Sequence, residues 1–299
     1  MARILLTGEN GQVGYELQTA LAGLGDVVAL DRTALDLASP DTIRSKVREI
    51  APQIIVNAAA YTAVDRAESE PELAMKVNGI APGVLAEEAK RLGALMIHYS
   101  TDYVFDGTKS GPYTETDTPT PLSVYGQTKL AGDQAIQVSG ASYYIFRTSW
   151  VYAARGQNFL RTMLRLSRER DELRIVRDQI GAPTWARFIA DVTARALKEA
   201  MRAPDKADAI RGLYNVTASG ATSWFGFAEA IFAEAKASLG TRVPKLVPIP
   251  GSEYPLPARR PLNSRLENAK LIKAFDLQPP DWRTMLKACM QEIRPNNRQ

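Results

Sequence analysis

The sequence of 299 residues contains one cysteine, Cys289, and one histidine, His98. A lone cysteine cannot form an internal disulfide, which favours a reducing cytoplasmic compartment. One His and one Cys are also too few for a metal site built from these two residue types. No apolar run approaches the ~20 residues of a membrane span, so we expect no membrane contact. The first residues already have the pattern of a strand, and we expect no signal peptide.

A strong charge of either sign is also missing. Lys and Arg number 37 against 33 Asp and Glu, a net charge of +4. This excess is too small and too dispersed to predict a nucleic-acid partner, although it is compatible with an anionic small substrate. The hydrophobic content of 45% is typical of a globular protein. The length accommodates one large α/β unit or two closely packed domains.

Strand and helix patterns alternate through the first half of the chain. The predicted strands cover residues 3–7, 27–30, 54–57, 95–100 and 143–148, and the predicted helices cover 13–24, 40–50, 70–77, 80–92 and 123–137. Such alternation predicts an α/β fold with a doubly wound parallel sheet of the Rossmann type. We therefore predict a dinucleotide-binding domain over residues 1–150.

After residue 150 the pattern is looser. We expect helices over 158–168, 185–201, 223–239 and 282–293, short strands over 173–176 and 213–216, and a stretch with six prolines over 244–261. These elements predict a smaller C-terminal substrate-binding lobe over 151–299, with some later segments returning to the first domain.

The first predicted strand ends in a glycine turn, Gly8-x-x-Gly11-x-x-Gly14, which the next helix follows. Glycines let the backbone approach a dinucleotide closely, and the N-terminus of the helix receives its pyrophosphate. Asp31 closes the second strand and suits a ribose 2′-hydroxyl, whereas the following Arg32 suits a 2′-phosphate. The sequence therefore predicts a nicotinamide cofactor and leaves NADH and NADPH open.

Three further side chains assemble a hydride-transfer site. Tyr125 and Lys129 are four residues apart, on one face of a helix. The ammonium favours the phenolate form of the tyrosine, which makes Tyr125 a usable proton donor. Thr101 follows the fourth strand, at the sheet edge where ligands bind, and can hold the reacting oxygen. This is the chemistry of a carbonyl reductase.

These motifs together resemble the extended short-chain dehydrogenase/reductase superfamily and, within it, the dTDP-4-dehydrorhamnose reductases. The strings that carry the narrower resemblance are Gly11-Gln-Val-Gly14-Tyr-Glu-Leu17, Ala63-Val-Asp65-Arg-Ala-Glu68, Tyr99-Ser-Thr-Asp-Tyr-Val-Phe-Asp-Gly107, Phe146-Arg-Thr-Ser-Trp-Val-Tyr152, Gly181-Ala-Pro-Thr184 and Ala258-Arg-Arg-Pro261. The resemblance implies reduction of the C4 ketone of dTDP-4-dehydro-6-deoxy-L-mannose to dTDP-L-rhamnose by NADPH or NADH. That product serves cell-surface polysaccharide (O-antigen) biosynthesis.

The resemblance also implies roles for individual residues. Tyr125 donates the proton, Lys129 binds the nicotinamide ribose and tunes Tyr125, and Thr101 bonds the reacting oxygen. The expected cofactor contacts are Gly8, Gly11, Gln12, Val13 and Gly14 at the pyrophosphate, Asp31, Arg32, Asp36 and Leu37 at the adenosine half, and Ala60, Tyr61 and Thr62 at the nicotinamide half. The expected contacts to the dTDP-sugar are Thr101, Asp102, Tyr103, Tyr125, Trp150 and Arg260.

One position departs from the family pattern. Some members look like metal-bridged dimers, and Glu16 and Glu292 match two of the acidic positions, but the third is Arg187. The resemblance leaves these two glutamates as candidate Mg²⁺ ligands and a homodimer as the candidate assembly. Arg187 argues against metal-dependent dimerisation, since a cation repels the metal and can pair with both carboxylates.

Two alternatives remain open. A nucleotide-sugar dehydratase or epimerase of the same superfamily shares the fold, but a dehydratase has a Glu after the Asp that follows the threonine, where this chain has Tyr103. A non-catalytic NADP-binding regulatory subunit is the second alternative, against which the intact Thr101, Tyr125 and Lys129 argue.

Overall fold

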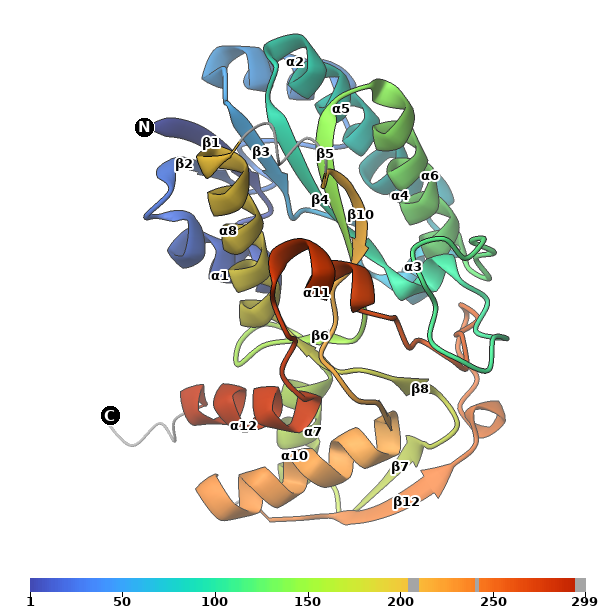
Figure 1. The fold of residues 1–299 in the computed structure, drawn as a ribbon. Coiled ribbons are helices and arrows are strands. Elements are labelled where there is room, and N and C mark those ends of the chain that lie inside the picture. The colour runs from blue at the N-terminus through green and yellow to red at the C-terminus, as the bar shows by residue number, and fades with distance from the viewer. Residues whose placement is uncertain (204–209, 240–241, 294–299) are drawn as a thin grey trace.

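A six-stranded, entirely parallel sheet forms the centre of the molecule (Figure 1). The computed structural model describes residues 1–203, 210–239 and 242–293. The strand order is β10-β5-β4-β3-β1-β2. The strands are β1 (Ala2–Thr7), β2 (Gly25–Leu30), β3 (Ile54–Asn57), β4 (Leu95–Thr101), β5 (Ser142–Thr148) and β10 (Gly212–Asn215).

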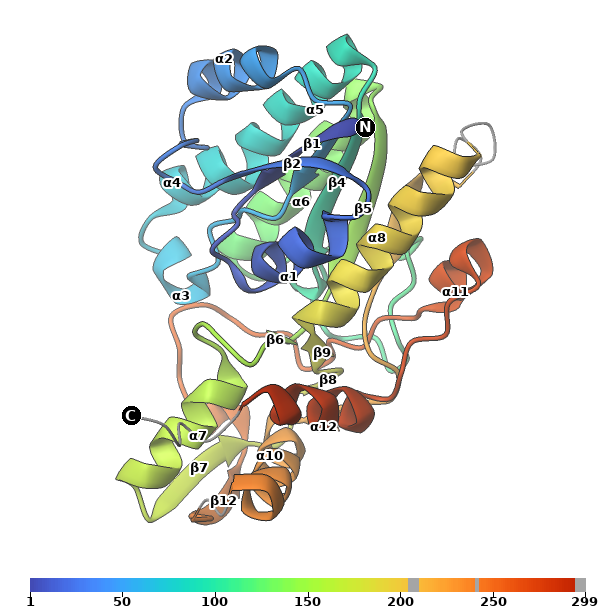
Figure 2. The same ribbon diagram turned by 90° about the vertical axis from the view of Figure 1, so that its left-hand side faces the viewer.

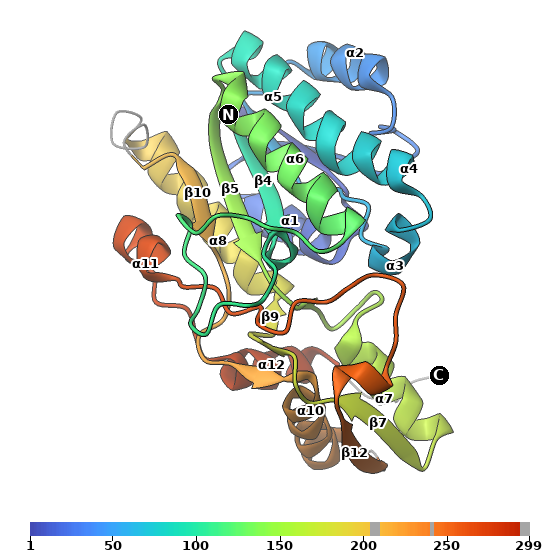
Figure 3. The same ribbon diagram turned by 90° about the vertical axis from the view of Figure 1, so that its right-hand side faces the viewer.

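Helices cover both faces of this sheet (Figures 2 and 3). One face carries α2 (Pro40–Ile50), α5 (Ala81–Leu92) and α6 (Val124–Ser139), and the other carries α1 (Gln12–Leu21) and α8 (Ala186–Arg202). Successive strand residues point to opposite faces. Accordingly Ile4 and Leu6 pack in the cluster under α1 and α8, while Leu5 packs in the cluster under α2 and α5. Strands buried on both faces explain the nearly continuous apolar runs in the sequence.

The helix before β4 is longer than predicted. Two helices were expected over 70–77 and 80–92, but α4 (Pro71–Met75) continues through a π-helical turn, η1 (Lys76–Ile80), directly into α5. A short helix that the sequence did not predict, α3 (Val64–Ala67), precedes α4. The π turn inserts one extra residue per turn without ending the helix.

The smaller lobe lies below the carboxyl edge of the sheet (Figure 1). It contains α7 (Phe159–Glu169), α10 (Trp224–Leu239), α12 (Trp282–Glu292) and the parallel pair β7 (Glu172–Val176) and β12 (Lys245–Ile249). The remaining short elements are η2 (Asp102–Val104), β6 (Val151–Tyr152), β8 (Ile180–Gly181), β9 (Thr184–Trp185), β11 (Thr222–Ser223), η3 (Gly251–Glu253) and α11 (Ala269–Phe275). Within the described residues no helix is both long and apolar enough to cross a membrane.

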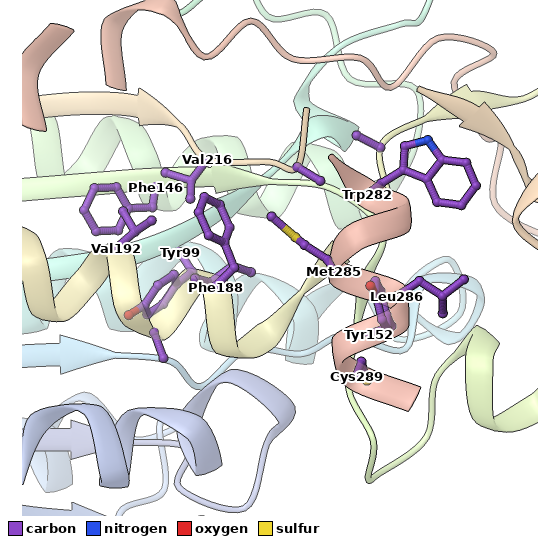
Figure 4. Packing of buried hydrophobic residues seen from close by; sticks show 14 of the residues in the cluster. Tyr99, Phe146, Tyr152, Phe188, Val192, Val216, Trp282, Met285, Leu286 and Cys289 are labelled. Carbon is purple, nitrogen blue, oxygen red and sulfur yellow. The ribbon is translucent and has the colours of Figure 1, made fainter. Parts of the chain in front are cut away.

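One apolar cluster connects the two parts. Figure 4 shows Tyr99 and Phe146 of the sheet beside Phe188 of α8, and Met285 of α12 next to them. The later chain also returns to the sheet, because β10 pairs with β5 and α8 packs against α1. The lobe is therefore joined to the sheet by a continuous core.

Candidate active site

A cleft of about 600 Å³ opens at the carboxyl ends of β1, β3 and β4. From β1 the chain proceeds first to β2 on one side and then to β3 on the other, so this edge is the point where the strand order reverses. Ligands of open α/β sheets bind at such a point. The cleft is lined by Thr7, Gly8, Asn10, Gly11, Gln12, Val13, Leu30, Asp31, Arg32, Leu35, Asp36, Leu37, Ala58, Ala59, Ala60, Tyr61, Thr62, Leu73, Val77, Tyr99, Ser100, Tyr125, Lys129, Thr148, Val151, Gly156 and Gln157.

The lining contains every residue that the sequence predicted for the cofactor except Gly14. Gly14 does not line the cleft, but it is needed for the shape of the turn, since a Cβ there would lie 2.0 Å from the carbonyl oxygen of Gly8. Gly8 itself has a φ of 73° and would carry a Cβ only 2.7 Å from the backbone of Ala59. Both positions need glycine to hold the turn. The turn leads into α1, whose N-cap Gly11 makes no side-chain capping bond, so helix N–H groups remain for an anion.

One end of the cleft is polar and suits a ribose. The carboxylate of Asp31 accepts hydrogen bonds from the Thr33 hydroxyl at 2.7 Å and from the amides of Thr33 and Ala34 at 2.9 and 3.0 Å, all at Oδ1. These bonds, the one from the Thr33 hydroxyl above all, lower the pKa of Asp31. None of these three bonds uses Oδ2, and the next residue, Arg32, is exposed. The site therefore presents an anion and a cation together at this end.

A loop from the smaller lobe reaches the glycine turn. Asn158 caps α7 by accepting from the amide of Arg161, and its Nδ2 donates to Gln12 Oε1 at 2.8 Å. The guanidinium of Arg155 lies 3.3 Å from the ring centroid of Tyr15 on α1. Residues 156–157 of this loop line the cleft, although the sequence analysis did not include them. The only local signal was an Asn in the N-cap position before a helix.

The π turn η1 also positions backbone at the rim of the cleft. Asn78 is 1% exposed, accepts from the amide of Tyr61 at 2.8 Å and donates to the Tyr61 carbonyl at 3.0 Å. It thereby fixes the backbone of residues 60–62 at the rim of the cleft. Asn78 was not predicted from the sequence, because its role depends on the π turn.

Tyr125 and Thr101 meet where the cleft joins the smaller lobe. The Thr101 hydroxyl beside Tyr125 lowers the pKa of the phenol, but burial has the larger effect and raises that pKa. The ring of Tyr103 contacts Tyr125 edge to face at a centroid distance of 5.5 Å. A hydroxyl pair at the end of β4, beside the cofactor cleft, can hold and protonate a carbonyl oxygen.

Lys129 lies one helical turn from Tyr125, as predicted, but its ammonium has other partners. Nζ donates to the carbonyl of Tyr99 at 2.6 Å and lies 3.1 Å from Nε2 of His98. Burial lowers the pKa of Lys129 to about 8. Burial has the largest effect on the pKa of Tyr125 and raises it, Thr101 lowers it, and the charges of Asp102 and Asp133 raise it. The effect of Lys129 on Tyr125 stays a prediction, and the Tyr99 carbonyl and His98, both on β4, hold the ammonium.

Asp102, Tyr103 and Arg260 form the side of the site toward the smaller lobe. Asp102 is 2% exposed, its Oδ1 accepts from Thr101 at 3.1 Å, and its Oδ2 has no hydrogen-bond partner among the described residues. Burial raises the pKa of this carboxyl to about 6. Arg260 donates from Nη2 to Asp65 Oδ2 at 2.7 Å, and its guanidinium lies 5.7 Å from the Tyr103 ring. Within the described part of the chain its buried Nη1 has no partner, so this nitrogen remains for a ligand.

Trp150 packs apart from the other residues predicted to bind the substrate. Its ring stacks on Trp224 with a centroid distance of 3.6 Å, and its backbone has a φ of 49°. A Cβ at Gly181 would lie 2.6 Å from the same ring. Trp150 is therefore held between Trp224 and Gly181 in the smaller lobe, while the other predicted substrate residues gather around Tyr125.

The two candidate metal ligands pair with Arg187 instead. Arg187 on α8 donates from Nε to Glu16 of α1 at 2.9 Å and forms a second ion pair with Glu292 of α12. No group of three His, Cys, Asp or Glu side chains within the described ranges is arranged to hold a metal. The guanidinium occupies the space between the carboxylates, so this donor set does not suit a divalent cation.

Comparison with known proteins decides the family. A family model described as RmlD substrate binding domain matches residues 2–294. A dTDP-4-dehydrorhamnose reductase of Burkholderia thailandensis is 54% identical over 294 residues, covering 97% of this chain and 99% of the relative. The protein of the same name from Escherichia coli K12 is 50% identical over 295 residues, 97% of each chain. The chain belongs to the dTDP-4-dehydrorhamnose reductase family.

The three-dimensional comparison agrees with this membership. The crystal structure of the dTDP-4-dehydrorhamnose reductase from Bacillus anthracis in complex with NADP has a TM-score of 0.89 to this fold at 35% identity, covering 97% of this chain and 99% of that one. The resemblance drawn from the motifs is confirmed, as are the doubly wound fold and the expectation of an oxidoreductase.

Proposed function

We propose that this dTDP-4-dehydrorhamnose reductase family member reduces the C4 ketone of dTDP-4-dehydro-6-deoxy-L-mannose to dTDP-L-rhamnose, a precursor of cell-surface polysaccharide. The observation that carries the proposal is the position of Tyr125, which lines the cofactor cleft and has Thr101 beside it. The named relatives support the choice of sugar.

In this proposal the cofactor supplies the hydride when it is bound. Thr101 and Tyr125 bind the ketone oxygen, and Tyr125 gives its phenolic proton to that oxygen as negative charge develops there. Lys129, which the Tyr99 carbonyl holds at the cleft wall, binds the ribose and favours the ionised form of Tyr125 through its positive charge. Burial of Tyr125 keeps the phenol protonated until the reaction draws the proton away.

The diphosphate of the sugar nucleotide is proposed to bind Arg260. Its Nη1 is buried and unpaired, while Asp65 holds Nη2 and so fixes the plane of the guanidinium. Arginine suits this role because its planar fork matches phosphate oxygens. Asp102 with its unpaired Oδ2 is the proposed acceptor for a sugar hydroxyl, and Trp150 the proposed apolar wall.

Both NADPH and NADH are proposed as hydride donors. Asp31 offers a free Oδ2 to a ribose hydroxyl, and the exposed Arg32 offers a cation to a 2′-phosphate. The B. anthracis relative was crystallised with NADP, which favours NADPH. A lower KM for NADPH that Arg32→Ala removes, with the KM for NADH unchanged, would establish Arg32 as the discriminating residue.

We further propose that activity needs no Mg²⁺, because Arg187 already pairs with Glu16 and Glu292. A homodimer at this surface would then form through direct ion pairs. The cytoplasm is the proposed compartment, on the basis of the single buried Cys289.

The test is a direct assay with dTDP-4-dehydro-6-deoxy-L-mannose and NADPH. We expect stoichiometric NADPH oxidation and formation of dTDP-L-rhamnose. A dehydratase or epimerase would instead turn over without net consumption of NADPH, and a regulatory subunit would bind NADPH without any turnover. Either result would contradict the proposal.

A further inference from the structure

A row of four buried polar side chains runs beneath the floor of the cleft and ends at Lys129. It comprises Thr7 of β1, Asn57 of β3, His98 of β4 and Lys129 of α6, each at most 2% exposed. The Thr7 hydroxyl lies 2.7 Å from Asn57 Oδ1, Asn57 Nδ2 lies 3.1 Å from His98 Nδ1, and His98 Nε2 lies 3.1 Å from Lys129 Nζ. Neither Asn57 nor His98 was assigned a role from the sequence.

The donors and acceptors of this row depend on one another. A neutral imidazole donates at one nitrogen and accepts at the other. A primary amide likewise donates from its nitrogen and accepts at its oxygen. In the arrangement shown, Asn57 Nδ2 donates to His98 Nδ1, so the ring proton is on Nε2 and points at Lys129. Lys129 can accept that proton's hydrogen bond only as a neutral amine, since an ammonium has no lone pair.

A charged Lys129 requires the opposite arrangement. The ammonium donates to Nε2, the ring proton moves to Nδ1, and Nδ1 donates to the amide oxygen of Asn57 after the amide has turned by 180°. The Asn57 amide nitrogen then donates to Thr7, whose hydroxyl hydrogen is free to point into the cleft that Thr7 lines. Both arrangements use the same four side chains at the same heavy-atom sites.

We propose that His98 is the positioning residue of Lys129, and that its ring tautomer and the Asn57 amide reverse together whenever Lys129 changes charge. The row thus gives the buried lysine a hydrogen-bond partner in both charge states. An unpaired buried polar group would otherwise penalise one of the two states. This inference rests on the proposed role of Lys129 in the reduction.

The electrostatic surroundings agree with a lysine that changes charge near neutral pH. Burial lowers the pKa of Lys129 to about 8, with Asp133 on the next turn of α6 opposing this effect. Burial and the charge of Lys129 lower the pKa of His98 well below its usual value, so the ring is neutral in both states. The other groups facing this region are Tyr125 on α6 and Arg147 on β5, which pairs with Asp133 at 3.4 Å.

Because His98 is the only histidine of the chain, its ring can be observed directly. Tag-free protein labelled with nitrogen-15 histidine is titrated by NMR from pH 6.5 to 9.5 without cofactor. We expect the protonated nitrogen to change from Nδ1 to Nε2 as the pH passes the pKa of Lys129. Lys129→Met should abolish the change, whereas Tyr125→Phe should preserve it. One unchanging tautomer, or a change that persists in Lys129→Met, would overturn the proposal.

Steady-state kinetics supply the second readout. Asn57→Asp offers His98 only acceptors and favours the charged lysine, so the alkaline limb of kcat should move up by about one pH unit. His98→Phe removes the hydrogen bond to a charged group, and kcat should fall about 10- to 100-fold. The KM for the sugar nucleotide should stay constant, and His98→Gln should recover part of kcat because its amide can still pair with Lys129.

The two kinds of failure are distinguishable. If the assigned substrate is wrong, no turnover is seen but the NMR change remains. If His98 has only a packing role, turnover is normal, the ring tautomer is constant and Asn57→Asp leaves the pH profile unmoved.

Discussion

At the scale of single residues, Tyr125 has neighbours of two kinds, the cofactor cleft on one side and Thr101 with Tyr103 on the other. Replacing Tyr125 by Phe keeps the ring and removes the proton. We expect kcat to fall by about 10² to 10⁴, with the Kd for NADPH unchanged in a fluorescence titration. Tyr143→Phe, on β5 outside the cleft, is the matched control. An active Tyr125→Phe variant would remove Tyr125 from the mechanism.

Asp102 gives a second prediction at this scale. Its pKa is about 6 in the folded protein against 3.8 ordinarily, because burial penalises the carboxylate. The folded state therefore binds this proton more tightly than the unfolded chain, and stability falls as the pH rises from about 4 to 6. At about 1.36 kcal/mol per pKa unit, the ionised group costs up to roughly 3 kcal/mol above pH 6.

Asp102→Asn should raise the free energy of unfolding by up to that amount at pH 7.5 and by much less at pH 4, as measured by urea unfolding at both values. The same variant should bind the sugar nucleotide more weakly, since a carboxylate acceptor is lost. The exposed Asp26→Asn serves as control. Equal effects at the two pH values would show that burial does not raise the pKa of Asp102 in the folded enzyme.

At the scale of elements, local chemistry decided how much the sequence could predict. The strand, glycine turn and helix around Gly8 and Gly14 were predictable, because the steric need for glycine acts within a few residues. The π turn Lys76–Ile80 was not, since it depends on close packing with α6, where a Cβ at Gly132 would lie 2.1 Å from the Asn78 carbonyl oxygen.

In the candidate site, too, local features were predictable and contacts between distant segments were not. Tyr125 and Lys129 share one helix, so their spacing alone predicted that they lie together. The partners of His98 come from β3 and α6, and the stacking partner of Trp150 comes from α10. Contacts between distant segments leave no periodic pattern, so these features required the structure.

Arg187 connects α1, α8 and α12 through its two ion pairs. Arg187→Glu would place three carboxylates together and should lower the free energy of unfolding by about 1.5–3 kcal/mol in EDTA. Mg²⁺ should restore part of that loss in the variant, whereas the unaltered enzyme should show the same melting temperature with Mg²⁺ and with EDTA. Arg202→Glu, exposed on the same helix, is the control. If EDTA lowered the activity of the unaltered enzyme, or the molecular mass of its assembly in solution, the surface around Arg187 would depend on a metal and the prediction would be contradicted.

At the scale of the whole molecule, the core shared by the sheet, α8 and α12 makes the two lobes one cooperative unit. We expect near-UV circular dichroism and enzyme activity to be lost in a single thermal transition. A fragment of residues 1–150 lacks β10 and α8 and leaves the α1 face of the sheet uncovered. It should therefore aggregate when expressed alone. Two separated transitions, or a monomeric folded fragment, would show that the lobes fold independently.

The late position of β10 has a consequence for how the enzyme is made. During translation β5 is an edge strand with unpaired backbone groups until residues 212–215 leave the ribosome. At roughly 5–20 residues per second, that edge stays open for several seconds. Open edges recruit strands from other chains, so nascent polypeptides on one messenger are at risk of joining there. The yield of active enzyme should thus depend on chaperone supply during this interval.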